Sequence, residues 1–198
     1  METSDLRDIA QKRYDDFVDA LREMVNVDCG SYTPDGVNVI ADLCQARFER
    51  GGWAVERVRH EPDEGQEQLG DLVIGRLEGS GSKRVLMIGH TDTVFDTGTV
   101  AERPFATQGD RAFGPGVTDM KGGLLTGFFA VEVLQAAGFE DFGRVTYICN
   151  PDEEIGSPCS RETILAEAMQ RLALGRSLFF LEQARALEAL VDRLWLQA

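Results

Sequence analysis

The sequence predicts an α/β fold with three layers (α/β/α) around a mixed, largely parallel sheet. The first observation is that short apolar runs at 72–77, 85–88 and 145–149 are bounded by glycine or charged residues and are too short to form helices. The second is that a longer segment with helical spacing, 122–137, lies between the last two of these runs. Strand, helix and strand in this order is typical of sheets with parallel pairing.

The N-terminal part is predicted to be helical. Apolar residues at helical spacing across 6–26 indicate an amphipathic helix, and a turn-rich segment at 28–36 separates it from a second helix at 37–48. Glycines at 51–52 are expected to end the second helix, because glycine adopts the left-handed cap conformation without steric cost. A strand is predicted at 53–58.

Beyond this strand the chain is expected to form a loop and then alternate between strands and helices. The segment 60–70 is acidic, polar and rich in turn formers, so we expect an exposed loop. The helix at 122–137 is predicted to pack on the sheet and to end at Gly138. A further helix is expected at 161–174, and a short apolar run at 178–181 favours another strand.

Composition narrows the classes of function. The chain has 198 residues, which suits one ordinary domain, and its 34 acidic and 20 basic residues give a formal net charge of −14. This charge would repel nucleic-acid phosphates and anionic lipids, so no nucleic-acid or membrane partner is expected. The most apolar segment, 124–134, is far shorter than the roughly 20 residues of a membrane-spanning helix. Residues 1–12 lack the apolar core of a secretion signal, so a cytoplasmic location is expected.

The cysteines do not indicate a fold stabilised by disulfides. They show no C-x-x-C pairing, and a cytosolic chain with a full core has little need of such bonds. We expect them to be mostly small buried residues, and a Cys149–Cys159 disulfide is the alternative.

The first candidate functional segment, GHTDTV at 89–94, follows an apolar strand at the end where open α/β sheets place ligand sites. Residues two apart on an extended strand face the same side, so His90 and Asp92 can meet. A carboxylate beside a histidine fixes the tautomer and orientation of the ring for a metal ion. The alternative is a strand that runs into a polar turn.

The second segment, GPGVTDMKGG at 114–123, puts Asp119 in a loop constrained by glycine and proline just before a helix. A carboxylate at such a bend can bind or bridge a metal ion. The alternative is that Asp119 caps the helix that starts near Gly122.

The third segment, NPDEEIGS at 150–157, places three consecutive carboxylates directly after the strand at 145–149. Like charges packed together raise one another's pKa unless a cation neutralises them. The adjacent residues Glu153 and Glu154 can then divide the work, one as metal ligand and one as base. The alternative is a solvated, acidic start of a helix.

In combination, GHTDTV, GPGVTDMKGG and NPDEEIGSPCSR resemble the M20 family of zinc metallopeptidases and amidohydrolases, and most of all its glutamate carboxypeptidase branch. The resemblance runs from about residue 5 to about residue 193. It implies a partial zinc-peptidase-like catalytic domain in which a metal-activated water attacks an amide carbonyl.

The resemblance implies a role for five residues. His90 would bind one zinc ion, Glu154 would bind the other, and Asp119 would bridge both. Asp92 would orient His90. Glu153 would be the general base that takes a proton from the metal-bridging water.

Two further implications concern single positions. The family often has a cis peptide bond at the Asp-Met bend, which predicts a cis Asp119–Met120 bond. The family's next ligand is an acidic residue usually preceding proline, and Glu182 is the candidate, with Gln183 in place of the proline. The alternative is that Glu182 is a surface residue of a helix through Ala198.

Family members normally continue into a lid domain that dimerises and binds substrate, and then supply a last metal-binding histidine. Residues 1–198 are therefore expected to be a partial catalytic domain, with the lid domain absent. The other histidine, His60, is expected to be an exposed loop residue. Because His90, Asp119 and Glu182 would complete the ligand set of one zinc ion only, we expect at most one tightly bound zinc per chain.

Two functions are compatible with these features. The first is a zinc-dependent hydrolase of peptide or amide bonds, of the carboxypeptidase or N-acyl-amino-acid amidohydrolase type, that acts on a small peptide or acyl-amino-acid substrate. The alternative is a truncated, catalytically silent relative that binds metal or a protein partner. Without the lid, such a relative is expected to expose apolar surface and to self-associate through it.

Overall fold

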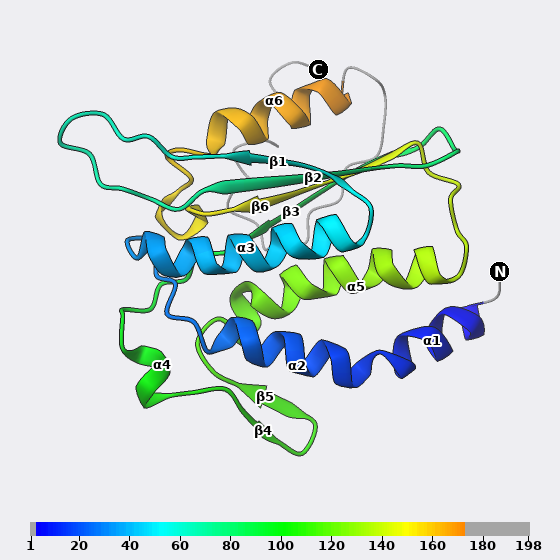
Figure 1. Ribbon diagram of the computed structural model, residues 1–198, viewed down its shortest axis with the longest axis horizontal. Helices are drawn as coiled ribbons and strands as arrows, with labels where there is room; N and C mark the ends of the chain where they lie inside the picture. Colours follow the sequence, from blue (N-terminus) through cyan, green and yellow to red (C-terminus); the bar gives the residue numbers. More distant parts are fainter. Residues whose placement is uncertain (1–2, 173–198) are drawn as a thin grey trace.

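The computed structural model describes residues 3–172, which form a four-stranded sheet with helices on both faces (Figure 1). The order of the strands across the sheet is β1 (Ala54–Val58), β2 (Leu72–Glu78), β6 (Arg144–Asn150) and β3 (Arg84–His90). Strands β2, β3 and β6 lie where the three apolar runs predicted them, and β1 lies within the strand predicted at 53–58. The α/β class and the mixed sheet are therefore confirmed.

The sheet is less parallel than expected. Strands β3 and β6 are parallel, whereas β1 with β2 and β2 with β6 are antiparallel. A parallel pair needs a crossover connection, and α5 (Gly122–Ala136) supplies one between β3 and β6. Strand β6 then pairs through its other edge with β2, which runs in the opposite direction. Among the described strands, the prediction of a largely parallel sheet is wrong for this reason.

The helices complete the three layers. Helices α3 (Pro34–Arg50) and α5 lie on one face of the sheet, and α6 (Arg161–Leu172) lies on the other (Figure 1). Helices α1 (Thr3–Lys12) and α2 (Tyr14–Val25) pack beyond α5, away from the sheet. The α/β/α layering is thus confirmed. The strand and helix expected after residue 172 lie outside the described residues.

The segment predicted as one N-terminal helix is two helices. They separate at Arg13, whose amide donates to the carbonyl of Ala10 in a three-residue turn (3.0 Å). The Arg13 guanidinium bonds to Glu132 on α5 (2.9 Å). No glycine or proline marks the break, so helical periodicity continues across it and conceals it.

Several short elements had no periodicity long enough to be predicted. They are α4 (Thr99–Glu102), the hairpin of β4 (Ala106–Gln108) and β5 (Arg111–Phe113), a π-helical turn at Val117–Lys121 and a 3₁₀ turn at Glu153–Ile155. The predicted loop at 60–70 contains no helix or strand. His60 within it is half-buried rather than exposed, because its Nδ1 accepts a hydrogen bond from the Leu69 amide (3.0 Å).

The core explains why the strands are continuous apolar runs. Side chains alternate between a larger cluster under α3 and α5 and a smaller one under α6, so both faces of each central strand are buried. In β6, Tyr147 and Cys149 face the larger cluster and Ile148 faces the smaller one. All four cysteines are free, and only Cys159 is exposed, so the structure does not contain the alternative disulfide.

No helix within residues 3–172 is long and apolar enough to cross a membrane.

Gly75 on β2 provides a test of this packing. A Cβ there would lie 2.3 Å from ring atoms of Phe48 on α3, and that ring is held by Phe128 at a centroid distance of 4.7 Å. We expect Gly75→Ala to lower the free energy of unfolding by about 1–3 kcal/mol through overpacking. Urea unfolding of Gly75→Ala, Phe48→Leu and the double variant would measure it. Because Phe48→Leu removes the ring that the new methyl group would meet, the double variant should be less destabilised than the sum of the losses in the two single variants. Losses that add up strictly would contradict this account.

Candidate metal centre

The parallel strands β3 and β6 bring two of the candidate segments together. His90 and Asn150, the last residues of these strands, are in register, and the Thr91 amide donates to the Asn150 carbonyl (2.7 Å). The 3₁₀ turn that carries Glu153 and Glu154 follows at once. The carboxyl ends of two neighbouring parallel strands thus deliver an imidazole and carboxylates to one edge of the sheet.

Asp119 reaches the same edge from the turn that precedes α5. Gly116 has a left-handed conformation (φ +76°), and Asp119 and Met120 have non-helical backbone angles that interrupt the turn. The Asp119–Met120 peptide bond is cis, which confirms the expectation from the family resemblance. Lys121, not Asp119, occupies the N-cap position of α5. Asp119 is therefore free to face the ends of the strands rather than the helix.

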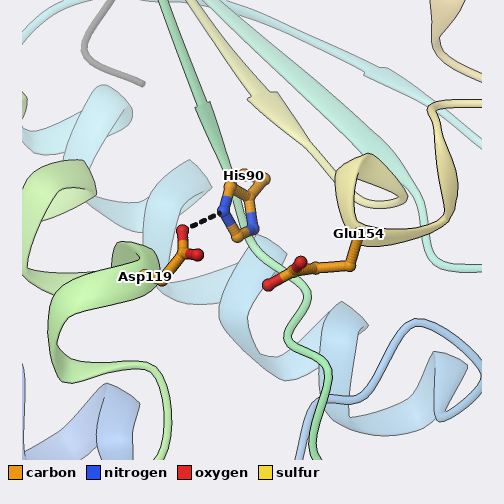
Figure 2. Close-up of side chains that lie close together, drawn as sticks. All are labelled: His90, Asp119 and Glu154. Atoms are coloured by element: carbon orange, nitrogen blue, oxygen red, sulfur yellow. Dashed lines mark hydrogen bonds and ion pairs between the residues drawn. The ribbon is translucent and has the colours of Figure 1, made fainter. Parts of the chain in front are cut away.

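Three potential ligands converge at this edge. His90, Asp119 and Glu154 each offer an atom within 4.8 Å of the other two (Figure 2). Nε2 of His90 lies 3.0 Å from Oδ1 of Asp119. His90 is fully buried, Glu154 is half-buried, and the Asp119 side chain is 73% exposed. The cluster is therefore enclosed by protein at His90 and open to solvent at Asp119.

The surroundings of His90 determine which nitrogen can bind a metal. Nδ1 lies 2.9 Å from the backbone oxygen of Asp92 and 3.2 Å from its carboxylate oxygen Oδ1. Both neighbours of Nδ1 are acceptors, and so is Oδ1 of Asp119 beside Nε2. With a metal ion between Nε2 and Asp119, the ring would keep its proton on Nδ1 and offer the lone pair of Nε2 to the metal. Nε2 is the nitrogen that faces Asp119. The ring is therefore oriented as a metal ligand requires.

Asp92 contacts more than the histidine. Its buried carboxylate accepts hydrogen bonds from the backbone amides of Glu153 and Glu154, each at 3.2 Å, and from the hydroxyl of Ser31 at 2.6 Å. The strand geometry predicted the proximity of His90 and Asp92. It did not indicate Ser31, which is 61 positions away in a loop with no motif of its own.

The electrostatics of the cluster favour a cation. Burial raises the pKa of the Glu154 carboxyl, and the negative charges of Asp119, Asp92 and Glu153 raise it further, whereas His90 opposes the rise. A metal ion among these groups would remove that cost by neutralising the carboxylates. One imidazole nitrogen and two carboxylate groups are also a donor set that zinc accepts in proteins. The residues present therefore fit a zinc ion.

The acidic segment at 152–154 is not a uniformly solvated helix start. Asp152 is fully buried and accepts hydrogen bonds from the Ser160 hydroxyl (2.5 Å) and the Cys159 amide (2.7 Å), so it closes the loop beneath the two glutamates. Glu153 is half-buried beside the cluster but is not one of the three converging residues. Glu182 lies outside the described residues.

Comparison with known proteins agrees with this geometry. The family described as Peptidase family M20/M25/M40 matches residues 86–191. Carboxypeptidase G2 of Pseudomonas sp. (strain RS-16) is 33% identical over 151 residues, which are 76% of this chain and 35% of the relative. Acetylornithine deacetylase of Myxococcus xanthus is 28% identical over 149 residues, which are 74% of this chain and 37% of the relative. The chain thus spans little more than a third of these relatives.

Solved structures share the fold. Human carnosine dipeptidase 1 superimposes with a TM-score of 0.74 at 21% identity, over 88% of this chain and 40% of the other. The M20 family metallo-carboxypeptidase Sso-CP2 of Sulfolobus solfataricus gives a TM-score of 0.68 at 18% identity, over 85% and 37%. With a family match that covers more than half of its length and the converging His90, Asp119 and Glu154, the chain belongs to peptidase family M20/M25/M40.

Proposed function

We propose that this chain is the metal-binding part of a zinc-dependent hydrolase that cleaves a peptide or amide bond next to a carboxylate-bearing residue. The observation that carries the proposal is the convergence of one imidazole and two carboxylates from three chain segments within 4.8 Å. The names of the two relatives, a carboxypeptidase and a deacetylase, support this reaction class. Small peptides and N-acyl-amino acids are the proposed substrates.

The proposal gives each residue of the cluster a task. His90, through Nε2, and the carboxylates of Asp119 and Glu154 would hold one metal ion, because the three groups lie within 4.8 Å of one another, in place of the separate ions that the family resemblance gives to His90 and Glu154. When bound, the metal supplies Lewis acidity and lowers the pKa of water to near 7. Glu153, beside these ligands, would accept a proton from the attacking water and pass it to the leaving amine. Asp92 would hold His90 in its binding tautomer. Glu182 is proposed as a further ligand.

The open side of the cluster fits this division of work. Asp119 is exposed at the edge of the sheet, so a substrate carbonyl can approach from solvent while His90 stays fixed in the protein interior. With two histidines in the sequence and one of them in the cluster, we propose at most one tightly bound zinc per chain. Residues 1–198 are assigned to a partial catalytic domain, and the cytoplasmic location stays a prediction.

The test is metal-dependent hydrolysis by the full chain. We expect the protein loaded with zinc to release glutamate from N-acylglutamates, to lose this activity in EDTA and to regain it on addition of zinc. A panel of other N-acyl-amino acids and dipeptides would define the substrate class. Inertness toward the whole panel, with zinc shown to be bound, would contradict the proposal.

A further inference from the structure

We propose that Ser31 is a positioning residue for the metal ligands, and that it acts by fixing the carboxylate of Asp92. This inference rests on the proposed metal-binding function. The Ser31 hydroxyl donates to Oδ2 of Asp92 at 2.6 Å, and both side chains are buried. A hydrogen bond to an ionised carboxylate in such a place is short and strong.

The carboxylate of Asp92 connects two ligand segments that are distant in the sequence. Its Oδ1 accepts the Glu153 amide (3.2 Å) and lies 3.2 Å from Nδ1 of His90. Its Oδ2 accepts the Glu154 amide (3.2 Å) together with the Ser31 hydroxyl. The planar carboxylate therefore sets the end of β3 and the 3₁₀ turn relative to each other. A rotation of this one group would disturb both His90 and Glu154.

Ser31 is held in place by its backbone and not by its hydroxyl. Gly30 pairs with Thr93 in a parallel bridge, the Ser31 amide donates to the Thr93 carbonyl (3.2 Å), and the Thr93 amide donates to the Cys29 carbonyl (2.9 Å). A Cβ on Gly30 would lie 2.4 Å from the Phe95 carbonyl oxygen, so only glycine permits this close approach. Removal of the Ser31 hydroxyl leaves these backbone contacts intact.

Without the hydroxyl, the buried Asp92 carboxylate loses its shortest hydrogen bond. Among residues 3–172, the two oxygens of the carboxylate then keep the longer bonds to the amides of Glu153 and Glu154 and the contact to His90. Loss of a partner that orients a ligand typically weakens metal binding 10–100-fold. Because Ser31 acts one step further out, through Asp92, we expect a loss at the lower end of this range, about 10-fold, for Ser31→Ala, with the fold preserved.

The experiment uses the full chain and Co²⁺ alone. Affinity is measured by competition with a chelator, and the ligand geometry is measured by the visible absorption of bound Co²⁺. We expect Ser31→Ala to bind Co²⁺ about 10-fold more weakly with an altered spectrum, and Ser31→Thr, which keeps a hydroxyl, to retain the affinity and spectrum of the unmodified chain. Ser80→Ala is the matched control, because its exposed hydroxyl donates to the Glu140 carbonyl (3.0 Å) at another place in the structure.

The same substitution in an Asp92→Asn variant tests whether Ser31 acts through Asp92. If Ser31 acts through Asp92, Ser31→Ala has no further effect on Co²⁺ affinity when Asp92 is already replaced by Asn. An equal loss in both backgrounds, or an unchanged affinity and spectrum of Ser31→Ala, would overturn the inference while the metal site stands. Failure of the unmodified chain to bind Co²⁺ would instead overturn the proposed function, and this inference with it. Metal-free urea unfolding shows that each variant is folded.

Discussion

Replacement of Glu153 by Gln is expected to reduce hydrolysis by about 10²- to 10⁴-fold while metal binding stays close to that of the unmodified chain, because this is the usual contribution of a general base. Glu153 lies next to the ligand Glu154 and is not itself one of the three converging residues. Its amide, which donates to Asp92, is unchanged by the substitution, so the turn keeps its position.

The measurement is the steady-state rate on the best N-acyl-amino acid, with zinc content determined on the same samples. Glu162→Gln is the matched control, because Glu162 is an exposed residue in the first turn of α6 and its loss should leave the rate unchanged. A Glu153→Gln variant with a rate near that of the unmodified chain would show that another group moves the proton.

Replacement of His90 by Ala is expected to weaken zinc binding by more than about 100-fold, because it removes a direct ligand rather than one of the groups that orient ligands. The remaining carboxylates of Asp119 and Glu154 cannot replace the buried nitrogen. Titration of the metal-free chain with zinc in the presence of a competing chelator measures the change.

The chain has a matched control for this substitution in its other histidine. His60 is half-buried, bonds to the Leu69 amide and is not part of the converging group. His60→Ala should therefore leave zinc affinity unchanged. Equal losses in the two variants would indicate a nonspecific effect of losing a histidine and would contradict the assigned site.

Strands β2, β3 and β6 were predictable because each is a short apolar run that contributes side chains to the core on both faces of the sheet. Pairing was harder to predict, since the insertion of β6 between β2 and β3 depends on contacts across the whole sheet and placed β6 antiparallel to β2. The pairing of β1 with β2 is antiparallel as well. The break at Arg13 was also hidden, because it involves a contact to Glu132 on a distant helix rather than a local breaking residue.

The candidate site was predictable where it depends on the ends of strands. His90 ends β3 and the two glutamates follow the parallel strand β6, so a local rule about strand ends was sufficient to bring them together. The contribution of Ser31 was not predictable, because it depends on the bridge between Gly30 and Thr93, which are far apart in the sequence. The role of Asp152 was concealed by its two acidic neighbours.

The central claim is that three distant chain segments bind one cation, and crystals of the full chain soaked in zinc test it most directly. Anomalous diffraction at the zinc edge should show a peak within about 2.0–2.2 Å of Nε2 of His90 and of carboxylate oxygens of Asp119 and Glu154. A strong anomalous peak next to other residues, and none next to these three side chains under saturating zinc, would contradict the account.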